Sequence, residues 1–122
     1  MFKEQIIKSK QYNLEDRTLE FSLRIIRLCK ALSHDRINDR LVNQLIRSGT
    51  SIGANYREAN ETDTKKDFKN RIRITKKEAK ETIYWLELII EANLNIRKRI
   101  TPLLEESREL MKIFASIYEK SK

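Results

Sequence analysis

Residues 44–59, QLIRSGTSIGANYREA, read as one helix in which small and polar residues stand where an amphipathic helix usually carries leucine or lysine. Gly49 and Gly53 lie about one turn apart in this run, and each costs a helix about 1 kcal/mol relative to alanine. Two such glycines in one helix indicate that another part of the protein approaches the helix backbone closely. The run therefore predicts a helix whose glycine side packs tightly against another helix.

Residues that form turns are too few for a β protein, since the 122 residues include two glycines and one proline. Hydrophobic residues make up 39% of the chain and charged residues 36%, a mixture typical of solvated helices around an apolar seam. A chain of this length builds one modest hydrophobic core. We therefore expect a single all-α domain.

Apolar residues recur with the helical period along four segments, which predict helices over about 14–33, 36–60, 63–93 and 102–119. Asn13 is the expected N-cap of the first helix, and Thr62 or Asp63 that of the third. Thr101 followed by Pro102 predicts the start of the fourth. Because the links between the long helices are short, we expect an up-down-up-down four-helix bundle.

The expected helices carry more apolar surface than one bundle core requires. Trp85, with Ile74 and Leu88, lies away from the predicted core face of the third helix, where exposure to water is costly. Polar groups on the second helix are expected to bond another helix or another subunit. The predicted subunit interface comprises Leu19, Leu23 and Ile26, then Gln44, Ser51, Asn55 and Glu58, then Ile74, Trp85 and Leu88. We expect these surfaces to join copies of the chain into a closed ring.

The net charge of +8 favours an anionic partner. Residues 65–80 contain eight Lys or Arg and two acidic residues, and five of the eight recur at i+3 or i+4 on one helix face. These five, called the basic stripe below, are Lys66, Lys69, Arg73, Lys76 and Lys80. We predict that they contact RNA or DNA phosphates without reading sequence. The alternative is a solvated helix face on which Glu78 and Glu81 pair with neighbouring cations.

Residues that carry catalysis or hold metals are scarce. One Cys and one His exclude an internal disulfide and a Cys/His zinc site, and no Glu-x-x-His motif is present. Ser48 and Ser51 have no histidine near them in the sequence, and His34 lies in a predicted link. We expect no enzyme activity, no cofactor and no metal.

No segment approaches the roughly 20 apolar residues that cross a bilayer. The first ten residues, MFKEQIIKSK, are charged throughout and lack the apolar segment of a signal peptide. The sequence therefore predicts a soluble, cytoplasmic protein without membrane contact.

The run 44–59 resembles the signature of the small four-helix-bundle proteins encoded in 23S rRNA intervening sequences. The matching positions are Gln44, Arg47, Ser48, Ser51, Ile52, Asn55 and Glu58. The segments 67–68, 77–79, 81 and 84–87 also resemble that family, so the likeness is strong over about 41–92. Tyr56 and Arg57 depart from it, because a small or apolar pair is usual there.

The resemblance implies a bundle that assembles into a homopentameric barrel. A similar protein is the accessory factor of diversity-generating retroelements, where it binds the reverse transcriptase and nucleic acid through a basic surface. We therefore predict a non-catalytic, homo-oligomeric scaffold whose basic surface contacts RNA or DNA non-specifically. The alternative is a protein-interaction module that recruits a partner such as a reverse transcriptase without contacting nucleic acid.

Overall fold

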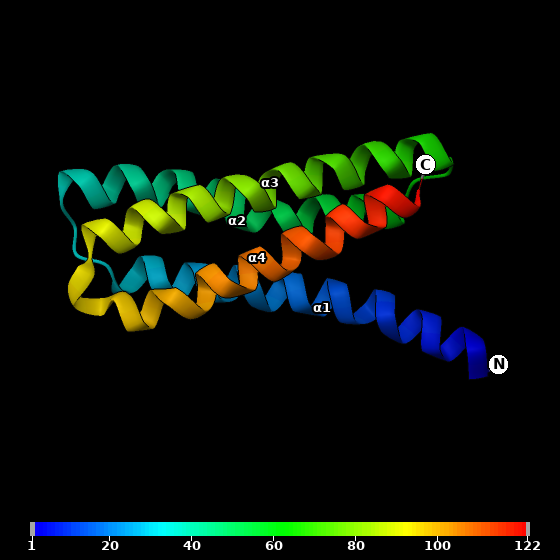
Figure 1. Cartoon of the computed structure of the whole chain (residues 1–122), viewed down its shortest axis with the longest axis horizontal. Coiled ribbons are helices and arrows are strands. Elements are labelled where there is room, and N and C mark those ends of the chain that lie inside the picture. The colour runs from blue at the N-terminus through cyan, green and yellow to red at the C-terminus, as the bar shows by residue number, and fades with distance from the viewer. Residues whose placement is uncertain (1, 122) are drawn as a thin grey trace.

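The structure, a computed structural model, describes the backbone of residues 2–121 and the side chains of residues 14–121. The chain forms four long α-helices: α1 (Phe2–Ala31), α2 (Arg36–Asn60), α3 (Lys65–Ala92) and α4 (Arg97–Lys120). A short 3-10 helix, η1 (Leu94–Ile96), joins α3 to α4. Consecutive helices run antiparallel beside one another (Figure 1), which agrees with a bundle. The all-α class is confirmed, since no strand occurs within residues 2–121.

The first helix begins much earlier than predicted. α1 starts at Phe2 rather than near residue 14, so Asn13 lies inside a continuous helix and the expected start there is wrong. No glycine or proline interrupts residues 2–13. An asparagine inside a helix costs less than about 1 kcal/mol relative to alanine, too little to end it. By contrast α2 begins at Arg36 as predicted, with Asp35 Oδ1 accepting the backbone N–H of Asn38 at 2.7 Å.

The N-cap of α3 is neither of the two residues expected. Thr64 caps this helix, and its Oγ1 accepts the backbone N–H of Asp67 at 3.1 Å. The hydroxyl of Thr62 instead donates to the carbonyl oxygen of Ala59 at the end of α2, at 2.7 Å. Both threonines are therefore used at helix ends, Thr62 at the end of α2 and Thr64 at the start of α3.

The expected cap of α4 is also wrong, because the helix begins at Arg97 and contains Pro102 within it. Thr101 donates its hydroxyl to the carbonyl oxygen of Arg97 at 2.9 Å instead of capping the helix. The additional N-terminal turn places Ile100 in the core with no exposed surface. Burial of such a side chain contributes about 1.5–3 kcal/mol, which offsets the backbone hydrogen bond lost at the proline.

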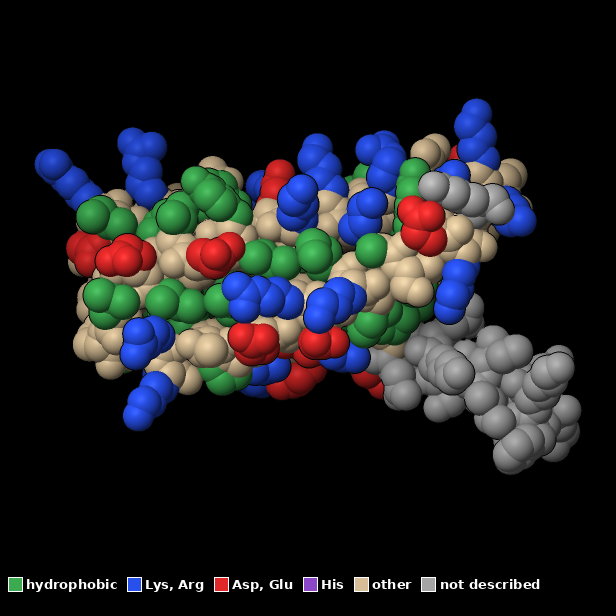
Figure 2. All heavy atoms as spheres, viewed as in Figure 1, with side chains coloured by type: hydrophobic (Ala, Val, Ile, Leu, Met, Phe, Trp, Pro, Cys, Tyr) green, Lys and Arg blue, Asp and Glu red, His purple; other side chains and the backbone are tan. Residues whose placement is uncertain are grey.

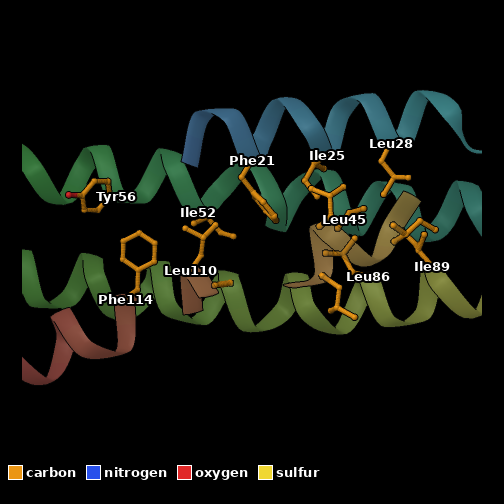
Figure 3. Packing of buried hydrophobic residues seen from close by; sticks show 14 of the residues in the cluster. Phe21, Ile25, Leu28, Leu45, Ile52, Tyr56, Leu86, Ile89, Leu110 and Phe114 are labelled. Carbon is orange, nitrogen blue, oxygen red and sulfur yellow. The ribbon is translucent and has the colours of Figure 1, made fainter. Parts of the chain in front are cut away.

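The core runs along the axis between the four helices, and all four contribute to it. Tyr56 of α2 packs against Phe114 of α4, with ring centroids 5.3 Å apart (Figure 3). The other core residues labelled in Figure 3 are Phe21, Ile25 and Leu28 of α1, Leu45 and Ile52 of α2, Leu86 and Ile89 of α3, and Leu110 of α4.

The glycine side of α2 faces α1, as the sequence predicts. A Cβ added at Gly49 would lie 3.1 Å from Ile25 Cγ1, and one added at Gly53 would lie 3.0 Å from Thr18 Oγ1. Neither glycine has a positive φ, so backbone conformation does not require them. At either position a Cβ would require Ile25 or Thr18 of α1 to shift by a few tenths of an ångström, and this confirms the predicted close approach of helices.

Candidate nucleic-acid and subunit interfaces

The basic stripe lies on α3 along the side that borders α4. Figure 2 shows Lys and Arg side chains projecting along the edge of the molecule formed by α3. Lys66, Arg73 and Lys80 have exposed side chains, whereas Lys69 and Lys76 are half-buried. The stripe is therefore continuous along the helix but uneven in its access to solvent.

The two half-buried lysines share one aromatic partner on α4. Lys69 Nζ lies 5.1 Å and Lys76 Nζ 4.6 Å from the ring centroid of Tyr118. A cation over an aromatic face keeps its charge but is restrained in position. These two lysines thus contribute to the positive field of the edge, while the three exposed residues are better placed to meet a phosphate directly.

Glu78 and Glu81 do not neutralise the stripe in the way that the solvated-face alternative expects. Both carboxylates contact Arg47 of α2: Glu78 Oε2 lies 3.0 Å from Arg47 Nη1, and Glu81 Oε2 contacts Arg47 Nη2. Burial raises the pKa of Glu78, which is 8% exposed, and the guanidinium of Arg47 opposes that rise. Burial raises the pKa of Glu81 as well. Hydrogen bonds with Arg47 and Glu78 outweigh this effect, so the pKa of Glu81 is lowered overall.

Other polar residues of the signature run also face α3 in the same chain. Ser48 is buried, and its Oγ lies 3.0 Å from the hydroxyl of Thr82. Asn55 Oδ1 accepts a hydrogen bond from Arg71 Nη1 at 3.1 Å, while Asn55 Nδ2 donates to the carbonyl oxygen of Ser51 at 2.9 Å. These bonds set the register of α2 against α3 within one chain. Gln44 and Glu58, also predicted to lie at the subunit interface, are exposed.

The outer face of the α2–α3 pair is hollowed at two places. One groove, with a volume of about 720 Å³, brings Gln44 and Arg47 next to Trp85. A second, of about 440 Å³, brings Glu58 next to Ile74. The structure therefore places four of the predicted interface residues along one helix pair.

Trp85 is less isolated than the sequence suggests. Its side chain is half-buried and packs against the edge of the core, and Ile74 and Leu88 are half-buried as well. The expectation that Trp85 lies well away from the core is therefore wrong. Trp85 occupies a position of α3 that faces α2, where its indole both covers core residues and borders the groove.

The predicted apolar stripe of α1 is exposed in the single chain. Leu19, Leu23 and Ile26 retain 46%, 36% and 39% of their surface, respectively. Four further large hydrophobic side chains of residues 14–121 are exposed without having been predicted at an interface: Ile37 and Ile46 of α2 at 63% and 38%, Tyr84 of α3 at 55% and Leu94 of η1 at 56%. The sequence contains a signal for the exposure of two of them: Ile46 lies on the glycine side of α2, and Tyr84 follows Lys80 by one helical turn.

Among the side chains of residues 14–121, no cluster of three or more His, Cys, Asp or Glu is arranged to hold a metal ion. Within the same described part of the chain, no helix is apolar over a length that would cross a membrane.

The comparisons with known proteins agree with the helical fold. The family model described as 23S rRNA-intervening sequence protein matches residues 10–116. The crystal structure of a protein of unknown function from the S23 ribosomal protein family of Bacteroides thetaiotaomicron is similar, with 41% sequence identity and a TM-score of 0.74. That match covers 85% of this chain and 96% of the other. None of the curated proteins compared matches this chain. Since the family model spans most of the sequence, the chain belongs to the 23S rRNA-intervening sequence protein family.

Proposed function

We propose that this protein is a non-catalytic helical scaffold that self-associates into a closed ring, a homopentamer, and binds RNA or DNA non-specifically along the basic stripe. The observation that carries the proposal is the presence of two unlike surfaces on one small chain. An exposed apolar surface lies on α1, and an exposed basic edge lies on α3.

The apolar surface of α1 supports self-association. Leu19, Leu23 and Ile26 lie within two turns of one helix, so their exposed parts form a contiguous patch. A contact between this patch and the groove beside Glu58 and Ile74 of a second copy joins two different surfaces. Such a contact repeats from copy to copy and leaves no free surface when the ring closes.

The basic edge supports contact with phosphates. Lys66, Arg73 and Lys80 are exposed on one side of α3, and Glu78 and Glu81 are paired with Arg47 on another. A ring repeats this edge around its axis, which multiplies a weak electrostatic contact. Binding of this kind is insensitive to base sequence and falls steeply as salt rises.

Self-association is tested by placing a charge in the α1 patch. Leu23→Asp should give monomers in sedimentation velocity, because an aspartate cannot be buried unpaired in an apolar contact. Leu94→Asp is the matched control: Leu94 is also exposed, at 56%, but lies in η1 outside the proposed interface. If Leu23→Asp sediments as the wild-type protein does, α1 is not part of the subunit contact.

Nucleic-acid binding is tested by removing equal charge from different places. Arg73→Gln with Lys80→Gln should weaken binding and reduce the slope of log K against log salt by about two. Lys69→Gln with Lys76→Gln removes the same charge over Tyr118 and should reduce the slope less. Arg36→Gln with Arg40→Gln, at exposed positions of α2, is the control that should leave the slope near its wild-type value. Equal effects of all three pairs would contradict a stripe-specific contact.

The alternative function is recruitment of a protein partner, such as a reverse transcriptase, without nucleic-acid contact. It is favoured by the engagement of Lys69 and Lys76 with Tyr118, which restrains two of the five predicted phosphate contacts. Capture of a partner that survives both nuclease treatment and the Arg73→Gln, Lys80→Gln pair would support this function over the first.

A further inference from the structure

The basic stripe leads to an exposed aromatic side chain. Tyr84 follows Lys80 by four residues and Lys77 by seven, so all three lie on one side of α3. At 55% exposure, Tyr84 is the one aromatic residue among the exposed large hydrophobic side chains of residues 14–121. More than half of the surface of Tyr84 is therefore accessible to a ligand.

The ring of Tyr84 is held by its neighbour. Its centroid lies 5.1 Å from that of Trp85, with an angle of 70° between the planes, which is an edge-to-face contact. Such a contact restrains the tyrosine ring without covering it, as its exposure shows. Tyr84 is thus a flat apolar surface that is already in place before any ligand arrives.

The surroundings of Tyr84 combine charge with apolar surface. It borders the 720 Å³ groove, which Lys77 and Lys80 also line together with Trp85 and two acidic residues, Glu81 and Glu87. Arg47 lines the same groove, but its charge is met by Glu78 and Glu81. Lys77 and Lys80 therefore outnumber the remaining acidic residue, Glu87, beside an aromatic ring, a combination complementary to a phosphate followed by a base.

We propose that the nucleic acid bound by this protein is single-stranded, with its phosphates along the basic stripe and an unpaired base stacked on Tyr84. The inference rests on the proposed function and names the class of nucleic acid. Bases of a duplex are stacked on each other and offer no free face, so an aromatic ring at this position adds affinity only for a single strand. From Lys66 to Tyr84 the helix spans about 27 Å at about 1.5 Å per residue, which accommodates several nucleotides.

The test compares Tyr84→Ala with Tyr84→Phe on three ligands of equal length. These are an oligothymidylate, the same strand with abasic sugars, and a duplex. Tyr84→Ala should weaken binding of the oligothymidylate about 5- to 150-fold, and Tyr84→Phe, which keeps the ring, should bind as the wild type does. Neither variant should change binding of the abasic strand or the duplex, because those contacts involve phosphates alone.

A second readout uses the single tryptophan of the chain, Trp85. A base stacked on Tyr84 lies next to the indole, so the oligothymidylate should change the tryptophan fluorescence and the abasic strand should not. Sedimentation of both variants should match the wild type, which separates an effect on stacking from an effect on assembly.

The outcomes distinguish the two proposals. If the wild-type protein binds none of the three ligands at low salt, both the proposed function and this inference fail. If it binds them in a salt-dependent manner and Tyr84→Ala binds equally well, the stacking role is overturned while the charge-based function stands. An equal loss on all three ligands would also overturn the stacking role.

Discussion

Asn38 at the start of α2 and Asn93 at the end of α3 exchange two side-chain hydrogen bonds. Nδ2 of Asn38 donates to Oδ1 of Asn93 at 3.0 Å, and Nδ2 of Asn93 donates to Oδ1 of Asn38 at 2.9 Å. Each Nδ2 also donates to a backbone carbonyl oxygen, that of Ser33 at 3.0 Å or of Ile89 at 2.9 Å. Both amides are buried and fully bonded, and they tie the first link to the end of α3.

The first prediction concerns this pair. Asn38→Ala and Asn93→Ala should each lower the free energy of unfolding by about 1–3 kcal/mol, because each leaves the other amide buried with an unmet hydrogen bond. The double variant should cost less than the sum of the two, since the second change removes a group already unpaired. Urea unfolding measures all three, with Asn95→Ala, at an exposed position, as the control. Strictly additive costs would contradict the coupling.

The second prediction concerns the contact between α1 and α2. Gly53→Ala should gain about 1 kcal/mol of helix propensity but lower stability overall by about 1–2 kcal/mol, because the new Cβ overpacks Thr18. Thr18 has little freedom to move, since its hydroxyl donates to the carbonyl oxygen of Leu14 at 2.8 Å. Ala54→Gly, at an exposed position, reports propensity alone in the same unfolding experiment. A more stable Gly53→Ala variant would mean that α1 moves aside easily.

The third prediction concerns the arginine that meets two glutamates. Arg47→Met should lower stability by about 1–2 kcal/mol near pH 7, a modest value because the side chain of Arg47 is 52% exposed. Burial already raises the pKa of Glu78, and Arg47 opposes that rise. Without Arg47 the pKa of Glu78 rises further above its value in the unfolded chain, so lowering the pH favours folding of the variant more than it favours folding of the wild type. The stability gap to wild type should therefore narrow as pH falls.

Chemical denaturation of Arg47→Met across a pH series measures this gap. Arg40→Met, at an exposed position of the same helix, removes the same charge and should show little gap at any pH. A gap that stays constant as the carboxylates become protonated would show that Arg47 stabilises the fold through packing alone.

The fourth prediction concerns the single thiol. Burial raises the pKa of Cys29 from 9.0 to about 11. At pH 8 the native protein should therefore contain about 100-fold less thiolate than an ordinary cysteine would, and alkylation should slow accordingly. Iodoacetamide labelling followed by mass spectrometry measures the rate, and the chain unfolded in urea is its own control because no other cysteine is present. Equal rates in the native and unfolded states would contradict the burial.

The sequence by itself determined which face of each helix is apolar. Periodicity alone marks Phe21 and Ile25 of α1 and Ile72 and Ala79 of α3 as core positions, and all four are buried. The two glycines likewise predicted where α2 is approached closely. These features are local, because the angle between successive side chains on a helix is constant and a missing side chain is visible in the sequence.

Helix starts were predicted less well, since the residue that begins a helix depends on what lies beyond it. Pro102 is a strong local signal for a first turn, yet α4 begins at Arg97 because an added turn buries Ile100. Thr62, Asp63 and Thr64 are all suitable caps, and only the path of the turn after α2 selects Thr64.

Only the tertiary structure decided which polar side chains meet. Asn38 and Asn93 are 55 residues apart, and Arg47 reaches two glutamates on a different helix. Two of the five lysines and arginines of the basic stripe, Lys69 and Lys76, lie over the ring of Tyr118. The five residues therefore differ in their surroundings, although their spacing in the sequence is regular. Periodicity sets the direction of each side chain around its own helix, but partners across helices depend on the rotation and offset of each helix. Those are set only when the four helices pack together around a shared core.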